Sequence, residues 1–456
     1  MLKKSTRDIK AKLENSAKSF TKSISSISTP TNTTKIAITG LSRSGKTVFI
    51  TSLIDQLIHQ KKIGNVTVKH RPFTSKLLPP KPTIKRFEYY KFEKDIKEDQ
   101  KWPKGTDNIT STIIELEIKS RFSVMPNSKK RVEIIDYPGE WILDISMLKL
   151  DYDKWCKKTI SWLKEIDEDI TNEYLKAITY LTDKSSGAEL ENKLHTVYLQ
   201  ALKALRKKHY SRLTPGRFLM PADLVDDPVL LFAPIYVSKS PLYKTFKNRY
   251  TTYIKDIVKN IQLEHFRKFD RQIVLIDVIE ALQNGFKCYK DMKEGVKDML
   301  LLYNHKNKNF ISQFFNPSID KVSFVATKAD LVASTQHNNY LALLNSMVED
   351  IRRDMDIKHV KTDTHIVAAV KCTQTFKEKH NGKILSCIRG IDSVSKKPVE
   401  IYPGEMPPSF PDKKTWDIED YKYEEFLPPD KPYKETEPFG HLYMDKVIES
   451  IIGDLL

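Results

Sequence analysis

The residues best suited to chemistry form one octapeptide near the start of the chain. Residues 40–47 read GLSRSGKT, a complete G-x-x-x-x-G-K-[ST] phosphate-binding loop. Glycines in such a loop let backbone amides wrap a polyphosphate, Lys46 reaches the β- and γ-phosphates, and the Thr47 hydroxyl coordinates Mg²⁺. The motif therefore predicts a catalytic role for Lys46 and nucleotide contacts from Gly40, Ser42, Arg43, Ser44, Gly45, Lys46, Thr47 and Val48.

A second group, Asp136-Tyr137-Pro138-Gly139-Glu140, directly follows the apolar run 131–135. A carboxylate at a strand end can hold the Mg²⁺ shell, and a glycine beyond it lets a backbone amide approach the γ-phosphate. Glu140 stands where many GTPases place the Gln that orients the attacking water, which makes it a catalytic candidate. The alternative is a solvated turn carboxylate, because a negative charge beside the γ-phosphate is unfavourable.

A third group, Thr327-Lys328-Ala329-Asp330, ends another apolar run at residues 321–326. GTPases read guanine with Asn-Lys-x-Asp at such a position: the Asp accepts from the base N1–H and amine, and the Lys stem covers the base. Thr327 replaces the usual Asn here. We predict nucleotide contacts from Thr327, Lys328 and Asp330, and from Lys371 in the small-residue stretch 368–371. The alternative is a strand-to-helix turn with a capping Asp.

Two further features of such a site have several candidates each: a threonine that completes the Mg²⁺ shell and an arginine that stabilises the transition state. Thr106, in the segment 102–106, is predicted to be a catalytic residue that completes a Mg²⁺ shell with Thr47 and Asp136. Thr110 is the rival, and an ordinary loop threonine is the alternative. Arginines that could stabilise transition-state charge from within the chain are Arg43, Arg86 and Arg217, although each one taken alone is more typical of a structural or surface arginine.

The elements that must position these groups follow from the apolar periodicity. Strands are predicted at 35–39, 272–279, 321–326 and 365–370, with an antiparallel hairpin from 112–118 and 131–135. Helical patterns fill residues 145–269, including 172–181 and 189–209, and a last helix spans 441–456. Residues 71–104 and 374–438 read as irregular. Strands alternating with helices predict a mostly parallel α/β sheet with helices on both faces.

These patterns predict three parts of the chain. A basic arm at 1–33 precedes a core made of 34–144 and 270–456, into which an all-α domain at 145–269 is inserted. The arm has the spacing of a basic amphipathic helix that can lie on an anionic membrane. The alternatives are a mobile arm or a helix docked on the protein's own core.

Composition narrows the location and the partners. Four isolated cysteines and the lack of an apolar span or a secretory signal predict a cytoplasmic protein, with the arm as its peripheral contact with the inner face of the membrane. The net charge of +17 is spread over most segments. The basic run 203–212 lacks the aromatic–basic interleaving of a nucleic-acid module, which disfavours nucleic acid as a partner.

Taken together, these motifs resemble the YcjX-like family of bacterial P-loop GTPases. The stretches that carry the resemblance are GLSRSGKT, DYPGEW, PGRF at 215–218, RQIVLID at 271–277, ATKAD and IYPGE at 401–405. The resemblance implies a Ras-like core with a helical insertion like that of heterotrimeric G-protein α subunits, with GTP/GDP and Mg²⁺ as ligands. It also implies a link to stress responses and a membrane-protein partner. The residues it carries over are Gly40, Gly45, Lys46, Thr47, Asp136, Gly139, Lys328 and Asp330.

The function favoured by the sequence is Mg²⁺-dependent hydrolysis of GTP to GDP by a nucleotide-controlled switch. Two alternatives stay open. One is an ATP-using ATPase or kinase, since the phosphate loop does not contact the base, although such an enzyme has no need of Asp330. The other is an interaction scaffold that a nucleotide stabilises, with negligible turnover.

Overall fold

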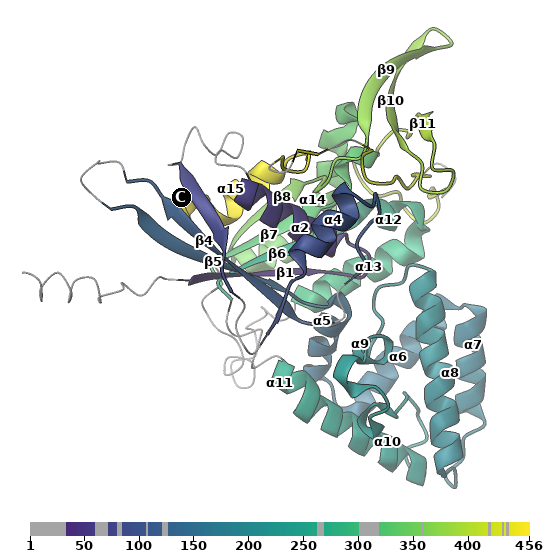
Figure 1. The fold of residues 1–456 in the computed structure, drawn as a ribbon. Helices are drawn as coiled ribbons and strands as arrows, with labels where there is room; N and C mark the ends of the chain where they lie inside the picture. The colour runs from purple at the N-terminus through teal and green to yellow at the C-terminus, as the bar shows by residue number, and fades with distance from the viewer. Residues whose placement is uncertain are drawn as a thin grey trace, which may run out of the picture.

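A mostly parallel sheet forms the centre of this mixed α/β protein (Figure 1). The computed structural model describes residues 33–59, 72–79, 84–105, 108–120, 126–261, 269–300, 319–357, 359–417, 421–430, 433–434 and 437–456. The predicted arm, apart from Thr33, and Thr106 therefore lie outside the described residues. In the part described, the sheet has eight strands: β1 (Thr33–Gly40), β2 (Phe73–Leu77), β3 (Lys85–Arg86), β4 (Thr110–Ile118), β5 (Ser128–Asp136), β6 (Arg271–Ile276), β7 (Lys321–Ala326) and β8 (Lys361–Ile366).

The strand order β2-β4-β5-β1-β6-β7-β8 places β1 in the middle, with β3 beside β4. The pairs β5–β1, β1–β6, β6–β7 and β7–β8 are parallel, which brings their carboxyl ends to one edge of the sheet. β4 and β5 pair in antiparallel fashion, which confirms the predicted hairpin, and β2 pairs with β4 in the same sense.

Each face of the sheet buries its own apolar cluster. Along β1, Ile36 and Ile38 belong to one cluster while Ala37 belongs to the other, as the two-residue repeat of a strand requires. The first face is covered by α2 (Lys46–His59), α4 (Tyr89–Lys97) and α15 (Met444–Ile452). The second is covered by α5 (Gly139–Ile145), α12 (Val278–Gln283), α13 (Gly285–Leu300) and α14 (His337–Asp356).

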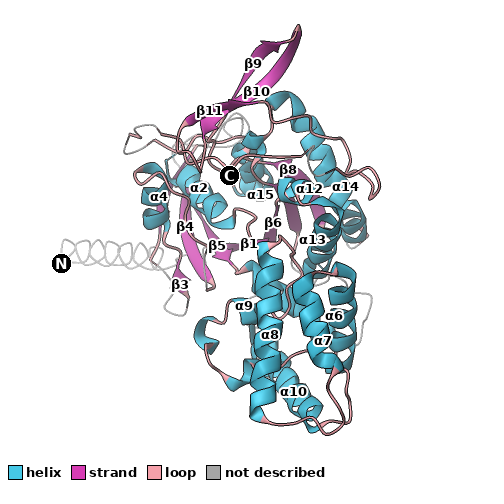
Figure 2. Ribbon diagram, turned by 90° about the vertical axis from the view of Figure 1, so that its right-hand side faces the viewer, coloured by secondary structure: helices cyan, strands magenta, loops and turns pink. Residues whose placement is uncertain are grey.

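The described chain between β5 and β6 contains helices only, and we call residues 139–261 the helical segment (Figure 2). Buried aromatic side chains hold it together, with Trp155 and Tyr198 in edge-to-face contact at 6.3 Å. After α5 its α- and π-helices are α6 (Tyr152–Ile166), α7 (Asp169–Thr179), α8 (Ala188–Lys207), α9 (Gly216–Leu219), α10 (Pro241–Thr252), a π-helical turn (Tyr253–Val258) and α11 (Lys259–Ile261). The helices predicted at 172–181 and 189–209 are confirmed as α7 and α8.

A second, three-stranded sheet interrupts the region that the sequence indicated to be irregular. Strands β9 (Gln374–His380), β10 (Lys383–Ile391) and β11 (Pro398–Ile401) pair in the order β11-β10-β9, and the β9–β10 hairpin projects away from the central sheet (Figure 1). Most β9 side chains are exposed. Because neither face of β9 is buried in a core, its sequence carries no apolar alternation, and the prediction of irregular structure is wrong here.

Three other predicted boundaries are wrong for local reasons. The strand predicted at 272–279 ends at Ile276, because Asp277 caps α12 by accepting the Glu280 amide at 2.9 Å. The strand predicted at 365–370 is β8 at Lys361–Ile366, a polar edge strand, and the buried apolar residues after it form a loop. Residues 71–104, which read as irregular, include α4 packed on α2. Among the described helices, none is both long and apolar enough to cross a bilayer.

Candidate functional site

The phosphate loop lies where β1 ends at Gly40 and α2 begins at Lys46. Arg43 and Gly45 both have left-handed backbone, with φ values of 67° and 74°, and this reversal aims successive amides inward. The loop touches the second motif closely: a Cβ on Gly139 would lie 2.2 Å from the Gly40 carbonyl oxygen. Only glycine fits at 139, so the two motifs identified in the sequence are packed against each other.

A cavity of about 610 Å³ opens at this edge of the sheet. All three predicted motifs border it, together with residues that the sequence did not single out. Predicted residues on its wall are Ser42, Arg43, Ser44, Gly45, Lys46, Thr47, Val48, Gly139, Glu140, Thr327, Lys328 and Asp330. The predicted residues Gly40, Asp136 and Lys371 are not part of this wall, and the Lys371 backbone amide donates to the Gly440 carbonyl at 2.7 Å.

Opposite charges face each other where the loop 40–47 borders the cavity, a part that we call the phosphate end. Lys46 Nζ lies 2.5 Å from Asp136 Oδ1, and the Asp136 side chain is almost fully buried. A buried ion pair of this kind lowers the cost of keeping both charges in the interior until ligands arrive. The Thr47 hydroxyl and the Asp136 carboxylate are oxygen donors, the ligand type that Mg²⁺ prefers, so these residues fit the cation that the motif implies.

The sequence does not identify the arginine at this end. Arg206, near the end of α8, donates from Nη2 to Glu140 Oε1 at 2.7 Å and to Ser42 Oγ at 3.3 Å, and it borders the cavity. It thus joins the helical segment to both phosphate-end motifs. In the sequence Arg206 stands in a basic run with Lys203, Lys207 and Lys208, and nothing in the pattern distinguishes it from them.

The three predicted arginines have different surroundings. Arg43 borders the cavity and its guanidinium lies 2.7 Å from His209 Nδ1, at the end of the helical segment's α8. Arg217 is buried over the Trp141 ring, 3.6 Å from its centroid, and donates to Pro221 and Asp223, a structural arrangement away from the cavity wall. Arg86 is exposed in β3, also off the cavity wall.

The threonines proposed for the Mg²⁺ shell remain predictions. Thr106 and its neighbour Asp107 are outside the described residues, although the preceding stretch 102–105 borders the cavity. Thr110, the rival, pairs with Asp136 in the β4–β5 register, and its buried hydroxyl has no hydrogen-bond partner within the described chain. Thr110 is not on the cavity wall described here.

At the opposite end of the cavity, which we call the base end, the turn after β7 carries the third motif, Thr327 to Asp330. Lys328 has left-handed backbone, with φ at 62°, and its Nζ lies 2.5 Å from Asp277 Oδ2. Burial favours the neutral lysine, but the carboxylates of Asp277, Glu280 and Glu425 together outweigh it and leave the pKa of Lys328 above its usual value. Asp277, from the motif RQIVLID, therefore fixes the lysine beside the cavity as well as capping α12.

Asp330 is buried on the cavity wall and is held by one residue in particular. The backbone amide of Cys372 donates to Asp330 Oδ2 at 2.8 Å, and the Cys372 thiol donates to the same oxygen at 2.9 Å. Burial raises the pKa of Asp330, and the bonds from Cys372 act in the opposite direction. The loop that contacts Asp330 is therefore at Cys372, just beyond the predicted Lys371.

Thr327, the replacement for the usual Asn, has one notable feature. Its carbonyl accepts the Tyr340 hydroxyl at 2.5 Å, which fixes the turn. Its side-chain Oγ1 is buried on the cavity wall with no partner among the described residues. Burying a hydroxyl without a hydrogen-bond partner costs free energy, and a polar ligand in the cavity would supply that hydrogen bond.

Two segments distant in sequence close the remaining side of the cavity. Residues 102–105 come from the stretch before β4, and Glu425 and Phe426 come from the C-terminal part of the chain. They are fastened together, because the Trp102 indole N–H donates to the Phe426 carbonyl at 2.7 Å. The sequence singled out 102–106 as the segment that carries Thr106. It assigned no role at the site to Glu425 or Phe426, which belong to no motif.

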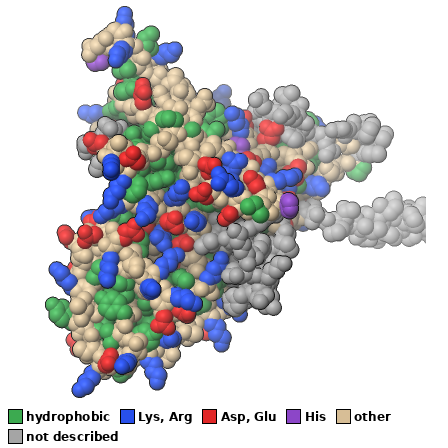
Figure 3. All heavy atoms as spheres, turned by 180° about the vertical axis from the view of Figure 1, so that it is seen from behind, with side chains coloured by type: hydrophobic (Ala, Val, Ile, Leu, Met, Phe, Trp, Pro, Cys, Tyr) green, Lys and Arg blue, Asp and Glu red, His purple; other side chains and the backbone are tan. Residues whose placement is uncertain are grey.

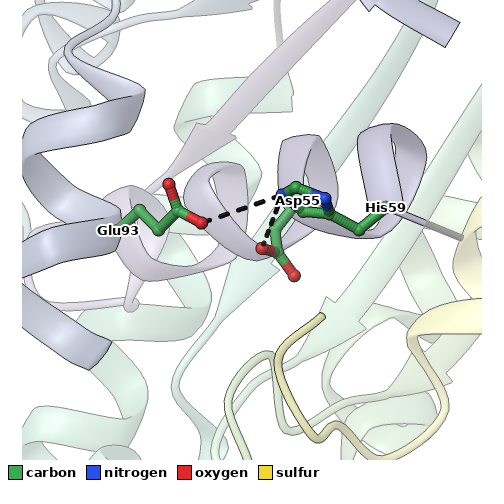
Figure 4. A group of neighbouring side chains, drawn as sticks. All are labelled: Asp55, His59 and Glu93. Atoms are coloured by element: carbon green, nitrogen blue, oxygen red, sulfur yellow. Dashed lines mark ion pairs between the residues drawn. The ribbon is translucent and has the colours of Figure 1, made fainter. Parts of the chain in front are cut away.

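A second cluster of potential metal ligands lies away from this cavity. Figure 4 shows Asp55 and His59 on α2 and Glu93 on α4 pointing toward one another. Lys97 already supplies a cation to both carboxylates, at 3.1 Å from Asp55 and 2.8 Å from Glu93. Asp55 also accepts the Phe439 amide at 2.7 Å. The cluster therefore ties the helix of the phosphate loop to α4 and the C-terminal segment, and it serves packing.

The surface charge has no single focus on the face seen in Figure 3. Lys and Arg side chains alternate there with Asp and Glu. The four cysteines, Cys156, Cys288, Cys372 and Cys387, are all free thiols.

Comparisons with known proteins agree with the motifs. The chain is 29% identical over 448 residues to the "Ras-like GTPase YcjX" of Escherichia coli K12, covering 92% of this chain and 96% of that protein. It is 25% identical over 459 residues to the "Ras-like GTPase YcjX" of Shewanella oneidensis, covering 92% and 94%. The model of the "YcjX-like family, DUF463" matches residues 34–456. The chain belongs to the YcjX-like family.

Proposed function

We propose that this protein binds GTP with Mg²⁺ and hydrolyses it to GDP. The observation that carries the proposal is convergence: three motifs that begin at residues 40, 136 and 327 border one cavity of about 610 Å³. Each motif suits one part of the ligand. The loop 40–47 suits the phosphates, Asp136 to Glu140 suits the γ-phosphate, and Thr327 to Asp330 suits the base.

Hydrolysis needs positive charge where negative charge develops, and two side chains can supply it. Lys46 exchanges its partner Asp136 for the β- and γ-phosphates. Arg206 exchanges Glu140 for the transferring phosphoryl group. Mg²⁺, held by Thr47 and Asp136 when bound, neutralises phosphate charge. Glu140, once released from Arg206, is the group placed to orient the attacking water, and its need to separate from Arg206 makes slow turnover the expectation.

Guanine selectivity follows from the polarity of the base end. Asp330 accepts from the N1–H and the amine of guanine, a donor pair that adenine does not offer. Lys328 is fixed beside the cavity by Asp277, so its stem can cover the base, and the unpaired Thr327 hydroxyl supplies one further polar contact. An ATP-using enzyme would gain nothing from a buried carboxylate at this position.

The wider organisation is proposed in the same terms. Residues 34–144 and 270–456 form a Ras-like phosphate-loop core, residues 145–269 form an inserted helical domain, and residues 1–33 form a separate arm. The relatives' name, Ras-like GTPase, favours a nucleotide-controlled switch. The family resemblance adds a role in stress and a membrane-protein partner, and the basic arm adds contact with the membrane from the cytoplasm.

The test is phosphate release by the purified protein with Mg·GTP and with Mg·ATP. The proposal predicts release from GTP in preference to ATP, and loss of release in Lys46→Met. Equal rates for the two nucleotides would favour the ATPase alternative. Tight GTP binding without any release would favour the scaffold alternative and contradict the hydrolase.

A further inference from the structure

The C-terminal residues 421–430, which we call the strap, are fixed against the cavity at Phe426. This side chain is buried, and its ring fills the space beside Gly390, where a Cβ would lie 2.5 Å from the ring. Its carbonyl accepts the Trp102 indole, and its backbone bridges to Asp392. Phe426 is thus held both by the second sheet and by the segment before β4.

Backbone bonds on either side of Phe426 determine where Glu425 stands. The Ser393 amide donates to the Glu425 carbonyl at 2.8 Å, and the Leu427 amide donates to the Ile391 carbonyl at 2.8 Å. With its main chain fixed on both sides, Glu425 presents an exposed side chain that borders the cavity. A carboxylate with a fixed backbone at a cavity rim loses little conformational freedom on binding a ligand.

The position of Glu425 relative to the other charges indicates which part of a nucleotide it meets. Glu425 shares the cavity wall with Lys328, at the base end, and its negative charge is among those that raise the pKa of that lysine. Lys46 and Arg206 mark the phosphate end. A carboxylate repels phosphates, so its favourable partners are neutral hydrogen-bond donors between the base and the phosphates. In a nucleotide these donors are the ribose hydroxyls.

We propose that Glu425 recognises the 2′- and 3′-hydroxyls of the ribose, and that the strap makes this a site for ribonucleotides rather than deoxyribonucleotides. Two carboxylate oxygens suit two adjacent hydroxyl donors, as acidic side chains suit ribose in dinucleotide-binding folds. This inference rests on the proposed nucleotide binding, and it assigns a specificity-determining residue to a segment without a sequence motif.

The test compares sugar preference with base preference by calorimetry. The full chain is titrated with GDP, 2′,3′-dideoxy-GDP and ADP, each with Mg²⁺, and the same is done for Glu425→Ala. The matched control is Glu424→Ala, which removes the adjacent exposed carboxylate that is off the cavity wall. Wild type and the control should bind GDP about 10-fold more tightly than the dideoxy analogue, the effect of hydrogen bonds to a charged group. Glu425→Ala should bring that ratio below about 2-fold while retaining the preference for GDP over ADP.

Two results overturn the proposal: wild type that binds GDP and its dideoxy analogue equally, or Glu425→Ala that keeps the full sugar preference. The ADP titration separates this inference from the proposed function. Equal binding of GDP and ADP would contradict the GTPase assignment, while a sugar preference that depends on Glu425 would still stand.

Discussion

The two ends of the cavity are built in different ways. The phosphate end consists mainly of two contiguous motifs, the loop 40–47 and the segment Asp136 to Glu140, which packs directly on the loop through Gly139. The base end is assembled from the turn after β7, Asp277 after β6, the loop at Cys372 and the strap. If the proposed function holds, phosphate binding depends on a few short motifs, whereas base and sugar selection depend on contacts between distant segments.

The largest expected effect concerns Arg206, the arginine that the helical segment contributes to the phosphate end. Arg206→Ala should lower the kcat for GTP by about 1000-fold, since an arginine on the transition-state charge is worth roughly that much. The affinity for GTP should change much less. Single-turnover phosphate release measures both quantities, with Lys207→Ala, the exposed neighbour on α8, as the control. An unchanged kcat would mean that the phosphate end works without the helical segment.

The next-largest effect concerns Lys46 in the phosphate loop. Lys46→Met should weaken GTP binding by about 100-fold, because the variant loses charge-assisted contacts to two phosphates. The variant also removes the ion pair between Lys46 and Asp136, which is expected to lower the stability of the nucleotide-free protein. Titration calorimetry checks the affinity, and Lys203→Met, an exposed lysine on α8, is the control. Wild-type affinity in Lys46→Met would separate the loop from phosphate binding.

The base end is tested by Asp330→Asn. Because the new amide N–H would face the N1–H of guanine, the preference for GDP over ADP should fall by about 10- to 100-fold. Affinity for the diphosphate common to both ligands should persist. Competition binding gives the ratio, and Asp354→Asn, an exposed aspartate on α14, controls for charge. A preference that survives in Asp330→Asn would place base selection elsewhere.

The smallest expected effect distinguishes Cys372, which contacts Asp330, from its neighbour Lys371. Cys372→Ala should weaken GDP binding by about 3- to 5-fold through loss of the thiol bond to Asp330, and Cys372→Ser should restore most of it. Lys371→Ala should change the affinity by less than about 2-fold, since Lys371 is off the cavity wall. The same competition assay applies. A larger effect of Lys371→Ala than of Cys372→Ala would reverse this assignment.

The sequence predicts features that depend on local patterns, but not those that depend on contacts between distant segments. The parallel sheet, the β4–β5 hairpin, α7 and α8 follow from apolar periodicity, and the phosphate loop follows from a contiguous motif. Arg206 could not be predicted, because its role depends on how the helical segment folds back onto Ser42 and Glu140. Cys372 and Glu425 carry no pattern either. β9 was missed because an exposed strand lacks a buried face to set a period of two.

The most direct test of the account is calorimetric titration of the nucleotide-free protein with Mg·GTP and, separately, with Mg·ATP. The account predicts saturable heat with one GTP bound per chain and at least about 10-fold weaker binding of ATP. Absence of binding heat with either nucleotide, at protein concentrations that would detect micromolar affinity, would contradict the claim that this cavity holds a guanine nucleotide.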